Sequence, residues 1–181
     1  MKKYIAFILM YIFAHIDKLL ASNKEKKRFE ECADYVNEHI EEECRKLRIR
    51  KPFVIIGLIN RPKTKGECVG GFYIRIDPLK DKGDDYLSTL RHELRHMQQW
   101  KYRRDAMMWL HVNLDKEKDK NEYWYNPAEI DARLYSRGYE SNIMDIPVDS
   151  FAEMKKNGTF IDQMKAVALF LGDVYAEIDC Y

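Results

Sequence analysis

Residues 92–96 read His-Glu-Leu-Arg-His, and this pattern strongly constrains the segment that contains it. On an α-helix, side chains four positions apart lie on the same face, one turn from each other. Two imidazoles arranged in this way can bind one zinc ion, and the glutamate beside the metal can accept a proton from water. The sequence therefore predicts that one helix carries His92 and His96 as metal ligands and Glu93 as a general base.

The residues around this motif also indicate a helix. An apolar stripe at helical spacing runs through the segment and is formed by Tyr86, Leu90, Leu94 and Met97. The alternative interpretation is an amphipathic helix without a metal, in which the histidines are solvated or are satisfied within the core.

The composition is that of an ordinary globular protein. The chain has 181 residues, of which 46% are hydrophobic, and this length suits one domain with its own core. Its 31 basic and 30 acidic residues leave a net charge of +1, so we expect no nucleic-acid partner. The cysteines at positions 32, 44, 68 and 180 form no CxxC pair and are expected to be reduced thiols.

Hydrophobic periodicity predicts an α+β fold that is mainly helical, with a small β-sheet before the motif helix. Helices are expected at residues 24–47, 126–138 and 160–178, and strands at residues 53–59 and 68–76. Gly70 and Gly71 indicate a bulge or a close backbone approach at the start of the second strand. Pro147 is expected to break the chain between the last two helices.

The N-terminus begins with Lys2 and Lys3 and continues with an uncharged run over residues 4–14. A membrane span needs about 20 apolar residues, so this run is too short for one. It can be a hydrophobic helix that packs on the domain or lies on a membrane surface, a cleaved signal, or a short anchor. Asp17 and Lys18 follow closely and favour the first interpretation. We therefore expect a cytoplasmic protein in which residues 4–20 either pack on the domain or contact a membrane surface, and a secreted one if residues 1–21 are cleaved.

A catalytic zinc needs a third protein ligand. The metzincin pattern is excluded because Gln99 and Tyr102 stand where that class has glycine and histidine. A later segment places Glu129 and Asp131 in the first turns of a helix that begins after Asn126. Glu129 is the favoured ligand because its longer side chain reaches a neighbouring helix more easily. If Glu129 instead forms a capping box with Asn126, Asp131 becomes the ligand. The carboxylate that does not bind metal is expected to orient a histidine.

The motif, the helix and short sheet before it, and the later helix opening at Asn126 resemble the small gluzincin-type zinc metallopeptidases. The layout is most similar to compact bacterial and phage proteins of the ImmA/IrrE type, over residues 24–138. A departure occurs at Arg133, where thermolysin-like enzymes carry an aspartate. From the N-terminal apolar run and the chain length we expect a hydrophobic helix over residues 1–22 and a single domain over residues 23–181, which the resemblance implies is zincin-like.

The resemblance also implies a function. His92, His96 and Glu129 would bind Zn²⁺, and Glu93 would be the base in hydrolysis of a protein or peptide substrate. In zincins an edge strand pairs with extended peptide, so the strand before the motif has either that role or a central place in the sheet. Arg133, Tyr135 and Tyr139 are candidates to stabilise the oxyanion. The alternative function is a zinc-binding regulatory or interaction protein with a peptidase-like fold and little or no turnover.

Overall fold

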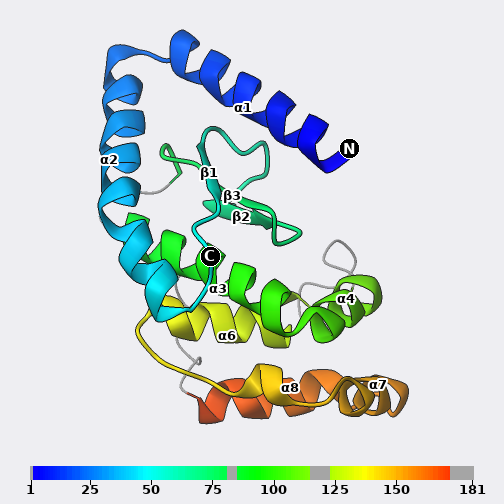
Figure 1. Ribbon diagram of the computed structural model, residues 1–181. Helices are drawn as coiled ribbons and strands as arrows, with labels where there is room; N and C mark the ends of the chain where they lie inside the picture. Colours follow the sequence, from blue (N-terminus) through cyan, green and yellow to red (C-terminus); the bar gives the residue numbers. More distant parts are fainter. Residues whose placement is uncertain (1, 81–84, 115–122, 172–181) are drawn as a thin grey trace. The chain divides into compact units, whose positions relative to one another are not determined.

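The computed structural model describes residues 2–80, 85–114 and 123–171 (Figure 1). These residues form seven α-helices, one short 3-10 helix and a three-stranded sheet, which confirms the prediction of a mainly helical α+β fold. The chain divides into two compact units, residues 1–98 and 99–181. Residues 86–98 of the motif helix α3 (Tyr86–Tyr102) fall in the first unit, and residues 99–102 fall in the second.

The sheet lies in the first unit and consists of β1 (Phe53–Ile56), β2 (Gly66–Val69) and β3 (Tyr73–Ile76). Its order is β1-β3-β2, with β1 parallel and β2 antiparallel to β3. In this register Ile74 pairs with both Val54 and Cys68. The strand directly before α3 is therefore central, and β2 is an edge strand of the described sheet.

The predicted bulge at Gly70 and Gly71 was wrong. These glycines form the turn of a hairpin that joins β2 to β3, so the single strand expected over residues 68–76 is two strands. Their φ angles are 54° and 70°, and Phe72 N donates to Val69 O at 2.9 Å. Two consecutive positive φ angles are what a tight hairpin turn requires, and glycine adopts them without strain.

Helix α2 (Asn23–Lys46) agrees with the helix predicted over residues 24–47. Ser22 and Glu25 form a capping box at its start. Its buried apolar side chains recur every three or four residues and are Phe29, Cys32, Val36, Ile40 and Cys44. Cys32, Cys44 and Cys68 are reduced thiols, and burial raises the pKa of the Cys44 thiol to about 11. Cys180 lies outside the described residues.

Two side-chain hydrogen bonds join helix α3 to helix α2 and its C-cap residue. Arg91 Nη2 donates to the buried Glu43 Oε1 at 3.0 Å, and Gln98 Nε2 donates to Leu47 O at 3.0 Å. Lys46 also donates to Glu43 Oε1, at 2.9 Å. Burial on its own would raise the pKa of Glu43, but the hydrogen bonds and charges of Arg91 and Lys46 outweigh it and hold the pKa below its ordinary value.

Helix α1 (Lys2–Leu20) packs one of its faces on the sheet. Phe7 contacts Phe53 and Tyr73, with ring centroids 5.0 Å and 5.5 Å apart. Ala14 lies directly against Gly57, where an added Cβ would come within 2.6 Å of the Ala14 Cβ. Among the described residues, α1 included, no helix has the length and apolar character needed to cross a membrane.

The second unit is helical. It contains α4 (Arg104–Asn113), α6 (Pro127–Ser136), the 3-10 helix η1 (Ile143–Asp145), α7 (Val148–Lys156) and α8 (Phe160–Phe170). Its largest fully buried side chains are Ile130, Leu134, Phe151 and Met164. The sequence did not predict α7, since Pro147 indicated a break, whereas this proline stands at the N-cap of the new helix. The predicted helix over residues 160–178 agrees with α8 up to Phe170, and residues 172–178 lie outside the described part.

The Glu43 contacts give a first prediction. Replacement of Glu43 by Gln should lower the free energy of unfolding by about 3 kcal/mol at pH 7, because it leaves Arg91 without its buried carboxylate. The pKa of Glu43 is lowered on folding, so this stabilisation is complete above the ordinary value of 4.5 and is lost as the pH falls through the folded-state pKa. Urea unfolding of both proteins at neutral and acidic pH measures the difference.

The matched control is Glu42→Gln, which removes an exposed carboxylate 2.9 Å from the same Lys46. An exposed ion pair of this kind contributes little, so this variant should unfold almost like the wild type. Equal losses in the two variants would contradict a special role for the buried Glu43.

Candidate metal centre

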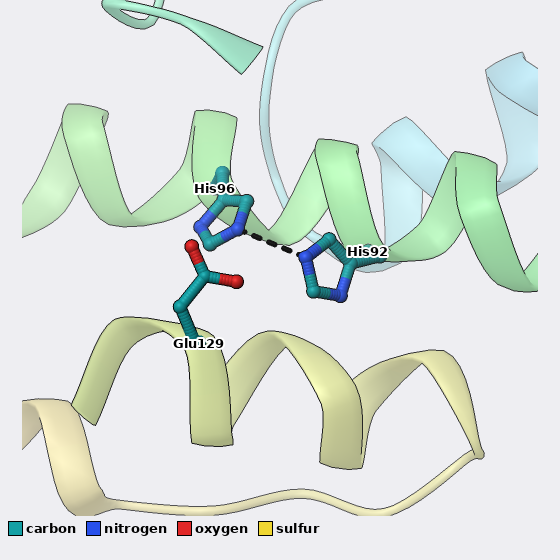
Figure 2. A group of neighbouring side chains, drawn as sticks. All are labelled: His92, His96 and Glu129. Carbon is teal, nitrogen blue, oxygen red and sulfur yellow. Dashed lines mark hydrogen bonds between the residues drawn. The ribbon is translucent and has the colours of Figure 1, made fainter. Parts of the chain in front are cut away.

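His92 and His96 lie one turn apart on α3, and their Nε2 atoms point toward each other (Figure 2). The two Nε2 atoms are 3.1 Å apart, and the ring planes are inclined by 85°. Nitrogen ligands about 2.0–2.1 Å from a tetrahedral zinc ion are separated by about 3.3 Å. The histidine pair therefore has the spacing that a single zinc ion requires.

Glu129 stands at the third position of α6, after Asn126 as N-cap and Pro127 as the first helical residue. The Asn126 side chain accepts a hydrogen bond from Ala128 N at 3.0 Å, and Asn126 N donates to Tyr123 O at 3.2 Å. The backbone amide that a capping-box glutamate would bind therefore already donates to another acceptor. Figure 2 shows the Glu129 carboxylate directed at the two histidines instead.

One ligand atom from each of His92, His96 and Glu129 lies within 4.8 Å of the other two, and Glu129 and His96 are buried. Two imidazoles and one carboxylate are the protein ligands of a well-known type of catalytic zinc site, with the fourth position left for water or substrate. These three side chains could therefore hold a metal ion.

Asp131, the alternative ligand, has different neighbours. Its side chain is 1% exposed, and its two oxygens accept from Gln99 Nε2 at 2.7 Å and from Ser141 Oγ at 2.6 Å. Gln99 Nε2 also donates to Ala128 O at 3.0 Å. Gln99 therefore holds α6 on both sides of Glu129, from a position three residues after His96 on α3.

This function of Gln99 could not be predicted from the sequence, where the residue only excludes the metzincin pattern. The available signal was its spacing, because positions 92, 96 and 99 share one face of a helix. That signal indicates a shared direction, but it does not identify Asp131 and Ala128 as the partners.

Glu93 is 5% exposed and lies along the edge strand β2. An added Cβ on Gly66 would come within 2.7 Å of Glu93 Oε1 and within 2.9 Å of the Thr89 methyl carbon. Further along the same strand, the Cys68 thiol donates to Met97 Sδ at 3.4 Å. Strand β2 therefore lies alongside α3 over about two helical turns. The absence of a side chain at Gly66 leaves space for the Glu93 carboxylate.

No known protein-family model, curated protein or solved structure matches the chain. Function must therefore be inferred from the chemistry of these side chains.

The predicted oxyanion residues differ in their surroundings. Arg133 donates to Trp124 O at 2.6 Å, and its guanidinium lies 5.1 Å from the centre of the Trp124 ring. Tyr135 is buried and Tyr139 is exposed. The contacts of Arg133 give it a structural role at the start of α6.

Gln99 provides the second prediction. The variant Gln99→Met keeps the shape of the side chain but removes both donors, which leaves the buried Asp131 with fewer partners. We expect unfolding to become easier by about 1–3 kcal/mol. We also expect zinc affinity to fall by about 10- to 100-fold, as is typical when the support of a ligand is removed. Thermal unfolding and competitive zinc titration measure the two effects.

The control is Gln98→Met on the same helix, which removes the hydrogen bond to Leu47 O and the one accepted from Arg95 Nη1 but does not change Gln99. It should lower stability without weakening zinc binding. Equal zinc affinities in the two variants would contradict the role assigned to Gln99.

Proposed function

We propose that this protein is a zinc-dependent metallopeptidase with a zincin-like site. In this proposal His92, His96 and Glu129 hold the zinc ion, and Glu93 is the general base. The observation that supports it most directly is the grouping of these three ligand side chains, with the histidine nitrogens 3.1 Å apart. Glu93 follows His92 on the same helix, in the place that the chemistry of peptide hydrolysis requires.

When bound, the zinc ion would polarise the scissile carbonyl group and make a water molecule more acidic. Glu93 would accept the proton of the attacking water and pass it to the leaving amine. Its burial against β2 restricts the carboxylate to few orientations, so it is held ready for this transfer. Gln99 and Asp131 would keep the helix that carries Glu129 in register.

An extended peptide is the substrate class that the sheet supports. In the described part of the chain, β2 pairs with β3 on one side, and its other edge has no partner strand. A peptide that adds to this edge binds through backbone hydrogen bonds, which are independent of its sequence. Because β2 runs beside α3 at Glu93, a peptide bound in this way would pass along the helix that carries the base.

The central test separates metal binding from proton transfer. Wild-type protein should contain about one zinc per chain, and His92→Ala or Glu129→Ala should lose it. Glu93→Gln should retain zinc but reduce hydrolysis by about 10²- to 10⁴-fold, because an amide cannot accept the proton. Elemental analysis and cleavage of a peptide library provide the two measurements.

Wild-type protein purified without chelator and free of zinc would disprove the proposal. Stoichiometric zinc without cleavage of any peptide would instead support a zinc-binding regulatory protein. If Asp131→Ala lost the metal while Glu129→Ala retained it, the ligand assignment would be reversed.

Gly66 gives a further prediction for the same reaction. The added methyl group of Gly66→Ala would displace the Glu93 carboxylate, and a shift of about 1 Å in a catalytic group can reduce the rate about 100-fold. Zinc content should not change, because the substitution is directed at the base and not at a ligand. Val69→Ala, at the far end of β2, is the control and should keep the wild-type rate. Loss of zinc from Gly66→Ala would show that the damage extends beyond Glu93.

A further inference from the structure

Helix α1 is apolar on both of its faces. Its inner face packs Phe7, Met10 and Ala14 against the sheet. Its outer face is a row of aliphatic side chains that are 42–82% exposed: Ile5, Ile8, Leu9, Ile12, Ile16, Leu19 and Leu20. We call this row of side chains the outer face of α1.

The charged residues near the end of α1 belong to the other side of the helix. Asp17 and Lys18 follow Ala14 by three and four positions and are only half-exposed, so they lie on the inner face. Lys18 Nζ is 3.5 Å from Glu30 Oε1 of α2. Among the described side chains of residues 5–20, an aliphatic surface without a charged group is therefore directed away from the sheet.

Positive charge is concentrated around this helix. Residues 1–28 contain seven lysines and arginines but only two acidic residues, whereas the whole chain has 31 basic and 30 acidic residues. Lys2 and Lys3 begin α1, and four further basic residues follow it between positions 24 and 28. A helix with basic segments at both ends complements an anionic surface.

We infer that α1 lies flat on a membrane surface that contains anionic lipids. The outer face enters the boundary between headgroups and acyl chains, and the basic residues at the two ends of the helix interact with lipid phosphates. An ordinary interfacial helix keeps its opposite face in water, whereas in this protein the sheet covers that face. This inference is independent of metal binding and of the proposed peptidase activity.

A second copy of the chain is the main alternative occupant. Residues 5, 9, 12, 16 and 19 have the alternating spacing of four and three that forms a coiled-coil seam. The positions beside such a seam commonly carry Glu and Lys, but here they include the exposed apolar residues Ile8, Phe13 and Leu20. A paired helix would leave these side chains in water and would bring two basic segments together. A lipid surface covers the full width of the outer face and neutralises the charge.

Vesicle flotation tests the inference on the full-length protein. Wild-type protein should float with vesicles that contain phosphatidylglycerol, bind less to pure phosphatidylcholine, and dissociate as salt is raised. The double variant Ile12→Glu, Ile16→Glu should bind the anionic vesicles about 10-fold more weakly or worse, since it removes two buried aliphatic side chains and adds two negative charges. Both positions are exposed, so circular dichroism should show an unchanged fold.

The matched control adds the same two charges elsewhere, at Val112 of α4 and Leu169 of α8, which are also exposed. Val112→Glu, Leu169→Glu should float like the wild type. Failure of the wild type to bind either kind of vesicle would overturn the inference, as would equal loss of binding in both double variants.

Light scattering without lipid tests whether a second copy of the chain covers the outer face. A wild-type dimer that the Ile12→Glu, Ile16→Glu variant converts to a monomer would show that a second copy covers the outer face.

Discussion

The helical repeat of α3 is the constraint on which the candidate site depends. Because successive residues turn by about 100°, one helix sends side chains in several directions at once. Leu90 and Leu94 enter the core. Arg91 contacts Glu43 of α2, and Glu93 lies beside strand β2. His92, His96 and Gln99 share a third face of the helix. A change in the phase of this helix would disrupt all of these contacts together.

Buried carboxylates keep that phase fixed, because each needs donors at defined positions. Glu43 accepts hydrogen bonds from Arg91 and Lys46. Asp131 accepts hydrogen bonds from Gln99 and Ser141. A buried carboxylate that loses a donor is costly, so such contacts select one rotation of a helix over others. Both carboxylates therefore help to fix the helices that carry the candidate site.

The sequence predicted the local features well. The helix that carries the motif and the early helix α2 could be predicted, because hydrophobic spacing and capping residues determine helices through neighbours only a few positions apart. The strand pair was missed, since a Gly-Gly pair in a strand-like segment can indicate either a bulge or a hairpin turn. Pro147 was equally ambiguous, because proline both ends helices and begins them. Each error arose where one residue type suits two backbone structures.

The choice between Glu129 and Asp131 could not be made from the sequence for a different reason. It depends on where Asn126 N donates and on which side chain Gln99 meets, and these contacts join residues far apart in the chain or depend on the conformation of a loop. Gln99 and Asp131 are 32 positions apart. Local pattern gives the direction of each side chain, whereas tertiary contacts decide its partner.

The packing of α1 also has a consequence for chain synthesis. Its inner face depends on Phe53, Gly57 and Tyr73, which the ribosome adds well after the helix itself. Until those residues have been made, neither face of α1 has its folded-state partner, and the whole helix presents apolar surface to its surroundings. Burial of the inner face of α1 can therefore begin only after the residues of β3 have been made.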